Sequence, residues 1–323
     1  MRLRGSVHTN GAASLTDELV KNVNKSIKQE PVSIKAESTR PVSPLQPVRR
    51  RRRIEDDVAS IKLELTPTKK IKKRAGIKER IIREEPSDWR ELLRGIEQMR
   101  VTKDAEVDKF GCETFFIKGL PPHVCRFHVL IAAMLSSQTK DPVNAAAMDR
   151  LIKHGLSVES MLEIDVQKLA LLIRPVGFFN LKAKYIKQTA SILTKKAEED
   201  GKDFVDIPNT YEALIALPGV GPKMATLVMT CAWKTTVGIC VDTHVHRISN
   251  RLKWVQTWNT KNPKSQDPEK TRAELEDWLP KEHWGTINPL LVGFGQTICL
   301  PRGPKCSECK IRGICPSANS SAI

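Results

Sequence analysis

LPGVGPKMA, residues 217–225, combines a glycine turn with the start of a helix. Gly219 and Gly221 permit a tight turn and the close approach of another backbone. Pro222 suits the first position of the following helix, because its missing N–H would have no partner there. The amides of Val220 and Gly221 at such a turn can hold a phosphate. An ordinary helical hairpin has the same pattern, so the stretch predicts a fold element and leaves its use open.

Lys223 occupies the first turn of this predicted helix, which is an unfavourable place for a cation. The exposed N–H groups at a helix start carry partial positive charge and favour acidic side chains. The lysine is therefore either an incidental, solvated side chain or one that is retained for its chemistry.

Helical periodicity continues outward from this hairpin through almost all of the chain after Trp89. In WRELLRGIEQMR (89–100) apolar residues recur every three or four positions, as on one face of a helix. HVLIAAMLSSQTKD (128–141) reads as an apolar helix that becomes polar at Ser136. Further helices are expected at Val143–His154, Val158–Glu163, Val166–Leu172, Leu181–Glu198, Tyr211–Ala216, Pro222–Trp233, Thr243–Leu252, Pro268–Leu279 and Trp284–Gln296. Strand-like alternation is rare, so the sequence predicts an all-α fold.

The segment VDTHVHR, residues 241–247, contains an aspartate and two histidines of interest. Asp242 comes directly before a predicted helix, where aspartate is a common N-cap. His244 and His246 are spaced like metal ligands, but no third ligand type lies nearby in the sequence. We therefore expect ordinary hydrogen-bonding histidines, and Asp242 has a structural interpretation that needs no chemistry.

Four clustered cysteines indicate a metal site, and they are Cys299, Cys306, Cys309 and Cys315. Their spacing is C-x6-C-x2-C-x5-C, and in a chain that shows no secretory signal such thiols are better metal ligands than disulfides. Zinc sites usually pair two short C-x2-C hooks, whereas one is present here. A [4Fe–4S] cluster also takes four thiolates, so the spacing favours iron–sulfur and leaves zinc as the alternative. The other cysteines, at positions 112, 125, 231 and 240, are expected to be core or surface thiols.

The composition is strongly basic, with 53 lysines and arginines against 37 acidic residues and a net charge of +16. Such a balance indicates a polyanionic partner such as nucleic acid. Residues 1–85 hold 21 of the basic and 11 of the acidic residues, and they contain no aromatic residue. We expect them to form a disordered basic tail. Its blocks RRRRR (49–53) and KKIKKR (69–74) resemble nuclear localisation signals or nucleic-acid contacts, the alternative being a solvated charge run.

Smaller signals in this tail concern modification and targeting. A motif of an aliphatic residue, lysine, any residue and glutamate occurs at Lys28, Lys35 and Lys62. It resembles the acceptor site for a ubiquitin-like modifier, although a segment rich in Ile, Lys and Glu also produces it by chance. Arg2, Arg4 and the lack of acidic residues before Asp17 weakly resemble a mitochondrial transit segment. No apolar run reaches transmembrane length, so no membrane association is expected.

The hairpin, the VDTHVHR segment and the cysteine spacing occur in an order that closely resembles the endonuclease III family of bifunctional DNA glycosylases/AP lyases, in its eukaryotic form with a basic N-terminal extension. The resemblance covers about residues 86–316 and implies a helix–hairpin–helix motif and a [4Fe–4S] cluster on the four cysteines. DNA would lie between two helical domains, with Lys223 and Asp242 on opposite walls. The implied division is a tail at 1–85, a cluster domain at 86–118 plus 237–316, a six-helix domain at 119–236 and a short tail at 317–323.

The resemblance also assigns catalytic roles. The damaged base would be flipped out of the duplex, and Lys223 would attack C1′ of the sugar. The resulting Schiff base allows β-elimination, which cuts the strand 3′ to the lesion, with Asp242 assisting proton transfer and sugar opening. Because the nucleophile must be neutral, we expect the positive helix end and partial burial to disfavour the ammonium form of Lys223, against the opposing charge of Asp242.

Several DNA contacts follow from the same resemblance. Gln138, in LSSQTKD, matches the family glutamine that fills the gap left by the flipped nucleotide. Phe178, in PVGFFN, stands where the family usually has a leucine wedge, so a core aromatic is the alternative. The remaining implied contacts are Gly219, Val220, Gly221, Arg302 and Lys305.

The implied function is base excision repair, in which a monomeric enzyme removes oxidised pyrimidines from damaged double-stranded DNA. The basic blocks favour the nucleus, and the transit-like start adds the mitochondrion as a second location. Adenine glycosylases share the motifs but lack the nucleophilic lysine, and they normally carry an extra C-terminal domain. A non-catalytic DNA-binding iron–sulfur module is the other alternative, and the presence of both Lys223 and Asp242 argues against it.

Overall fold

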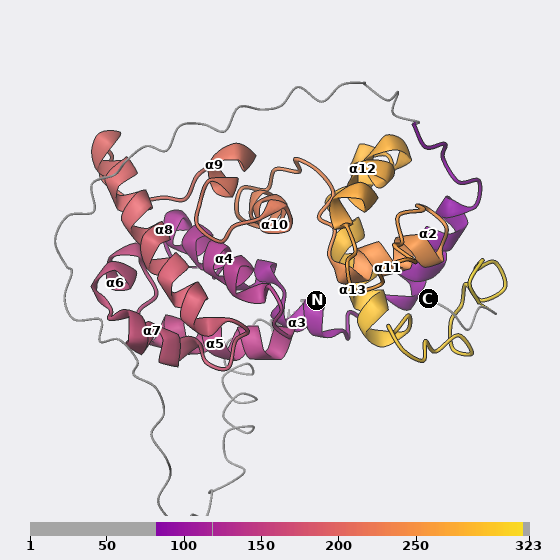
Figure 1. Cartoon of the computed structure of the whole chain (residues 1–323), viewed down its shortest axis with the longest axis horizontal. Helices are drawn as coiled ribbons and strands as arrows, with labels where there is room; N and C mark the ends of the chain where they lie inside the picture. The colour runs from indigo at the N-terminus through magenta and orange to yellow at the C-terminus, as the bar shows by residue number, and fades with distance from the viewer. Residues whose placement is uncertain (1–81, 118, 319–323) are drawn as a thin grey trace, which may run out of the picture. The chain divides into compact units, whose positions relative to one another are not determined.

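The computed structural model describes residues 82–117 and 119–318, and Figure 1 shows the path of the chain. The regular structure of these residues is helical, which confirms the predicted all-α fold. The α-helices are α2 (Trp89–Met99), α3 (Glu106–Phe110), α4 (Pro122–Ser136), α5 (Asp141–Lys153), α6 (Val158–Glu163), α7 (Val166–Ile173), α8 (Phe179–Glu199), α9 (Tyr211–Ile215), α10 (Pro222–Ala232), α11 (Thr243–Arg251), α12 (Pro268–Trp278) and α13 (Ile287–Thr297). The 3₁₀ turns η1 (Cys112–Phe115) and η2 (Lys281–His283) lie between them.

Side-chain caps fix the starts of several helices. The side chains of Ser157, Asp165 and Thr210 accept backbone N–H groups at the starts of α6, α7 and α9. Asp267 caps α12 in the same way. These bonds satisfy amides that have no partner inside the helix, so polar residues before the apolar runs set where the helices begin.

The boundaries of α4 differ from the expected helix at 128–141. The helix begins earlier, at Pro122, and ends at Ser136. A continuous helix through this region is disfavoured because Pro142 has no N–H and its ring would clash with the carbonyl of Gln138. The chain therefore leaves the helix after Ser136, passes through Gln138 with a φ of 49°, and starts again as α5 at Asp141.

Apolar side chains of the described residues gather in two cores. The first is built largely from α4 to α10 and includes Phe127, Leu130 and Met148. The second is built from α2 and α11 to α13 and includes Trp89 and Trp254. The helices that build the two cores form two groups in Figure 1, where α4 to α10 lie together and α2 lies with α11 to α13. The division of the chain at residues 118 and 236 stays a prediction.

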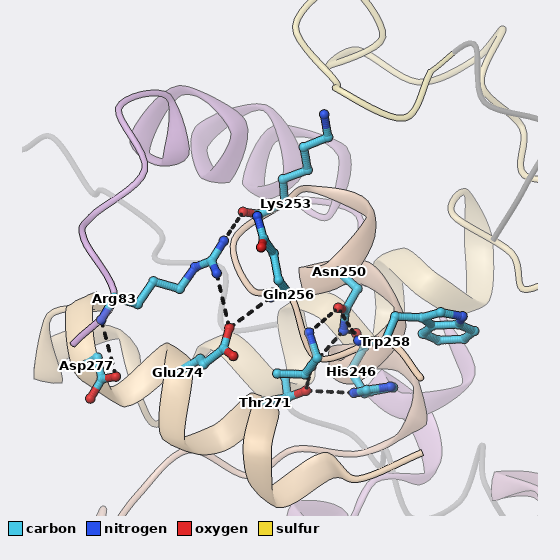
Figure 2. A network of polar contacts seen from close by, with 10 residues as sticks. Arg83, His246, Asn250, Lys253, Gln256, Trp258, Thr271, Glu274 and Asp277 are labelled. Carbon is cyan, nitrogen blue, oxygen red and sulfur yellow. Dashed lines mark hydrogen bonds and ion pairs between the residues drawn. The ribbon is translucent and has the colours of Figure 1, made fainter. Parts of the chain in front are cut away.

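The first described residues contact the second core through a polar network (Figure 2). The Arg83 guanidinium donates to Oε2 of Glu274 at 3.3 Å and to the carbonyl of Lys253 at 3.1 Å. Glu85 accepts a hydrogen bond of 2.5 Å from the indole N–H of Trp89. Both Arg83 and Glu85 fall within the range expected for the tail, yet they are bound to α12 and α2.

The remaining predictions for the tail lie outside the described residues. They concern the basic blocks at 49–53 and 69–74, the transit-like start, and the modifier motifs at Lys28, Lys35 and Lys62. Within the described part, none of the helices is both long and apolar enough to cross a membrane.

Candidate active site

The predicted hairpin is present as α9, a tight turn and α10. Gly219 has a φ of 75°, a left-handed conformation that glycine adopts without steric cost. A Cβ at this position would lie 2.3 Å from Cδ2 of Tyr185 in α8, so the turn and α8 are in close contact. Gly221 is the N-cap of α10, and Pro222 is its first residue. The side chain of Val220 is buried, so only its backbone is available to a phosphate.

Lys223 contacts two segments from other parts of the chain. Its Nζ is 3.4 Å from Oγ of Ser136, at the end of α4. Its carbonyl oxygen accepts a hydrogen bond of 3.6 Å from the thiol of Cys240. Cys240 precedes Asp242 by two residues, and the negative charge of Asp242 acts on Lys223. The structure therefore brings together the two catalytic candidates, which are 19 positions apart in the sequence.

The electrostatics of Lys223 differ from the sequence-based expectation. Burial alone lowers the pKa of Lys223 because it disfavours the ammonium form, as expected. Neighbouring ionisable groups outweigh this effect and raise the pKa above the usual lysine value; they are the thiols of Cys240 and Cys112 and the carboxylates of Asp242 and Asp141. The expectation that the helix end and burial would together favour a neutral amine is therefore wrong. Lys223 is an ammonium at neutral pH and has to lose a proton before it can act as a nucleophile.

Two buried thiols near Lys223 were not predicted as part of this region. Burial raises the pKa of Cys112 to about 11 and that of Cys240 to about 12. Both are therefore neutral thiols at pH 7, and the carboxylates are the groups that act on Lys223 as charges there. The sequence contains no signal for this arrangement, because Cys112 lies more than a hundred positions before Lys223.

Asp242 is the N-cap of α11, as the sequence predicts. Its Oδ1 accepts the backbone N–H groups of His244 at 2.9 Å and Val245 at 2.8 Å. These bonds hold the carboxylate in one place at the helix start. Because its charge also acts on Lys223, the capping role and a chemical role are compatible in the same side chain.

The two histidines after Asp242 are hydrogen-bonded, as expected. The ring nitrogens of His246 lie 2.7 Å from Oγ1 of Thr271 and 3.0 Å from Oε1 of Gln266, and its ring stacks on Trp258. Figure 2 shows His246 beside Thr271 and Trp258 in the polar network. His244 contacts Arg247, with 3.2 Å between Nδ1 and Nη2, and burial lowers its pKa.

Gln138 and Phe178 come from two loops in direct contact. Both residues are exposed and left-handed, with φ values of 49° for Gln138 and 57° for Phe178. Non-glycine residues rarely adopt this conformation, and those that do cluster at functional sites. A Cβ on Gly177 would lie 2.5 Å from the carbonyl oxygen of Gln138, so the loops meet at this glycine. Phe178 is 61% exposed, which is incompatible with the alternative of a core aromatic.

The four C-terminal cysteines follow α13 and line one cavity of about 800 Å³. In the part of the chain that the structure describes, no three His, Cys, Asp or Glu side chains converge closely enough to hold a single metal ion. The guanidinium of Arg251 donates to Sγ of Cys299 at 3.3 Å and to the carbonyl of Leu300 at 2.7 Å. Arg247 donates to the carbonyl of Cys299 at 2.9 Å. Two arginines of α11 thus anchor the start of the cysteine loop, and Arg251 is placed to offset thiolate charge.

Arg302 and Lys305 lie in the loop between the first two cysteines. Both side chains are exposed. They line the same cavity as the four cysteines.

Comparisons with known proteins agree with this geometry. A family model described as the HhH-GPD superfamily base excision DNA repair protein matches residues 131–281. Endonuclease III-like protein 1 of Gallus gallus is 51% identical over 234 residues, which cover 72% of this chain and 79% of that protein. The Bos taurus protein of the same name is 53% identical over 234 residues, which cover 72% of this chain and 73% of that protein.

A solved structure of a trapped endonuclease III–DNA covalent intermediate, an estranged-adenine complex, has a similar fold. It matches with a TM-score of 0.58 and 26% identity, and the match covers 72% of this chain and 95% of that chain. The identity to these relatives, together with the hairpin and the all-helical fold, is sufficient to assign the family. The chain belongs to the endonuclease III family, within the HhH-GPD superfamily of base excision DNA repair proteins.

Proposed function

We propose that this base excision DNA glycosylase removes oxidised pyrimidines from damaged duplex DNA and then cuts the strand through a lysine Schiff base. The observation that carries the proposal is the position of Lys223. It lies in the first turn of α10, where the negative charge of Asp242 acts on it. The solved structure with a similar fold is that of a trapped covalent intermediate between endonuclease III and DNA, which supports a covalent step in this protein.

The first chemical step requires a proton transfer because Lys223 starts as an ammonium. The carboxylate of Asp242 accepts the proton, directly or through water, and the free amine attacks C1′ of the flipped nucleotide. As the bond between Nζ and C1′ forms, the bond from C1′ to the base nitrogen breaks. The base leaves with the electron pair and takes up a proton. A proton returned to the ring oxygen O4′ opens the sugar and leaves a Schiff base at C1′.

Strand cleavage follows from the Schiff base. The protonated imine withdraws electrons and makes the C2′ hydrogens acidic, so a base can remove one of them. The electron pair then forms a C1′–C2′ enamine, and β-elimination expels the 3′ phosphate. The strand breaks 3′ to the lesion, and hydrolysis of the imine restores Lys223.

DNA contacts are proposed for the exposed groups around these two residues. The backbone amides of Gly219, Val220 and Gly221 would hold a phosphate at the start of α10, where the helix end favours negative charge. Gln138 and Phe178 would enter the duplex where the nucleotide has left it. Arg302 and Lys305 would bind the phosphate backbone from the cysteine loop.

We further propose that Cys299, Cys306, Cys309 and Cys315 hold a [4Fe–4S] cluster. All four line one cavity, and Arg251 donates to one of the sulfurs, which favours the thiolate that iron requires. The four cysteine thiolates would bind the iron, and these bonds would cross-link the loop after α13 and fix the positions of Arg302 and Lys305. Replacing Cys309 with serine should lower the iron content from about four atoms per chain. Stoichiometric zinc in the purified protein would contradict this assignment.

Other proposals concern the whole chain. The basic blocks at 49–53 and 69–74 support nuclear accumulation, and the transit-like start supports a mitochondrial fraction. A ubiquitin-like modifier on Lys28, Lys35 or Lys62 and a monomeric state remain predictions from sequence.

The proposed reaction is tested with duplexes that each carry one oxidised pyrimidine, such as thymine glycol. Excision alone leaves an abasic site, which alkali then converts into a strand break. Lyase activity breaks the strand without alkali. The purified chain should give both products at equal rates, and an undamaged duplex should give neither. Excision with alkali-dependent cleavage only would show a monofunctional glycosylase and contradict the Schiff-base mechanism.

A further inference from the structure

The ammonium group of Lys182, in the first turn of α8, is buried and satisfied by uncharged acceptors. The residue is 6% exposed. Its Nζ donates to the carbonyl oxygens of Leu135 at 2.7 Å and Ser137 at 2.6 Å, and to Oγ1 of Thr139 at 3.3 Å. Two of these acceptors belong to the loop after α4. The side chain therefore connects α8 to the break between α4 and α5.

A buried ammonium is costly unless its hydrogen bonds are satisfied. Here the end of α4 provides carbonyl oxygens and the negative end of a helix dipole, which favour a cation. Burial still lowers the pKa of Lys182 to about 8, so the site retains part of the cost. An apolar side chain would fill the same space without that cost, but it would leave the carbonyls of Leu135 and Ser137 without this donor.

The segment that Lys182 holds contains Gln138 in its left-handed conformation. A non-glycine residue in that region is strained and persists only where its surroundings enforce it. Lys182 binds the residues on both sides of Gln138, namely Ser137 and Thr139. The N–H of Gly177 donates to the same Oγ1 of Thr139 at 3.3 Å, which ties the loop to the turn before Phe178.

We propose that Lys182 is a positioning residue for duplex opening, which fixes the 137–139 loop so that Gln138 can fill the gap left by the flipped nucleotide. The inference rests on the proposed function, because it requires a flipped base. Lys182 touches neither the reacting sugar nor the base in this account. It acts through the backbone on either side of Gln138.

Lys187 provides a matched control on the same helix. Its Nζ also donates to carbonyl oxygens, those of Leu162 at 2.8 Å and of Ile164, at the end of α6. The chemistry of the two lysines is thus alike, but Lys187 holds a helix end that contains neither Gln138 nor Phe178. Lys187 is half-buried, whereas Lys182 is buried, and a general effect of removing a lysine that binds carbonyl oxygens from α8 should appear in both variants.

The test is a double-mutant cycle on the single-turnover rate of base excision from duplex DNA. Lys182→Met and Gln138→Ala should each slow excision about tenfold, and the double variant should be no slower than the slower single variant, because coupled residues are not additive. Lys187→Met should remain within about twofold of the wild-type rate. An unchanged rate in Lys182→Met, or effects that multiply in the double variant, would overturn the proposal.

A second readout separates positioning from folding. A duplex with a non-cleavable abasic-site analogue and 2-aminopurine opposite it reports on the side chain that enters the gap. At saturating protein, Lys182→Met should reduce the fluorescence change to the level of Gln138→Ala, while Lys187→Met keeps the wild-type change. If Lys182→Met does not fold, Thr139→Val weakens the same tie and should show the same coupling, and its absence would overturn the inference. A wild-type protein that leaves damaged duplex intact contradicts the proposed function, whereas an active wild type with an unaffected Lys182→Met contradicts only this inference.

Discussion

At the scale of single residues, the positive charge of Lys223 is stabilised by the carboxylates of Asp242 and Asp141. The sequence placed Lys223 at a helix start and Asp242 at a second one, and both positions are as predicted. The direction of the pKa shift of Lys223 could not be predicted, because it depends on burial and on charges that only the fold brings together. The same holds for Lys182 and the buried thiols, whose partners are distant in sequence.

Asp242→Asn should preserve the fold and slow the chemistry. Asparagine caps a helix about as well as aspartate, so the melting temperature should change little. The amide cannot accept a proton from Lys223, and the single-turnover rate of excision should fall by about a hundredfold or more, as for other general bases. A rate loss that follows an equal loss of stability would instead show that Asp242 acts only as a cap.

The pH dependence of that variant should reveal the protonation state of Lys223. Since the pKa of Lys223 is raised, the neutral fraction at pH 7 is small and grows about tenfold per pH unit until the pKa is reached. Without Asp242 as the proton acceptor, the residual excision rate should rise about tenfold per pH unit, in parallel with the neutral fraction of Lys223. The wild-type rate should depend less steeply on pH. Removing the carboxylate also lowers the pKa of Lys223, so the plateau should begin at lower pH in Asp242→Asn than in the wild type. Identical pH–rate profiles would contradict the role of Asp242 as the acceptor.

At the scale of secondary structure, α8 positions the parts of the site that come from the first core. Its start carries Phe178, its first turn holds the loop of Gln138 through Lys182, and Tyr185 packs on the hairpin at Gly219. The sequence predicted α6 to the residue and the hairpin helices to within one residue, because caps, glycines and prolines mark their ends. It missed the short α3, η1 and η2, which have too few residues for an apolar period to be recognised.

Two glycines of the hairpin provide a matched test of this packing. Gly219→Ala requires a left-handed alanine and places Cβ against the ring of Tyr185, so the free energy of unfolding should fall by about 1 kcal/mol or more. Gly221→Ala meets no atom within 4 Å and has an extended φ of −106°, so its stability should stay within about 0.5 kcal/mol of the wild type. Denaturant unfolding of both variants checks this prediction. Equal losses of stability would show that α8 does not brace the hairpin at Gly219.

At the scale of the whole molecule, the fold and the charge distribution have separate roles. The motifs that carry the proposed chemistry all lie after Trp89, whereas residues 1–81 hold 20 lysines and arginines against 9 acidic residues. Composition alone indicated a nucleic-acid partner, but it could not show at which residue the helical fold begins. The contact of Arg83 with Glu274 (Figure 2) and the contact of Glu85 with Trp89 show that these residues belong with the helices.

Deleting residues 1–81 should leave the single-turnover rate unchanged and weaken DNA binding. The removed cations would no longer contact phosphates or release counterions, so the loss in affinity should be largest at low salt and shrink as salt rises. Measurement of Kd between about 50 and 200 mM salt checks this prediction. Deletion of residues 1–88 serves as a control, since it also removes Arg83 and Glu85 and should lower the melting temperature. Loss of excision on deletion of residues 1–81 would show that the tail is part of the active fold.

The central claim is that Lys223 forms a covalent bond with C1′ of the damaged nucleotide. Borohydride reduces such a Schiff base to a stable amine, so enzyme incubated with a thymine glycol duplex and borohydride should be trapped on the DNA. Mass spectrometry of the digested adduct should place the modification on the peptide that contains Lys223, and Lys223→Ala should give no adduct while it retains duplex affinity. Trapping at another amine, or undiminished trapping by Lys223→Ala, would contradict the account.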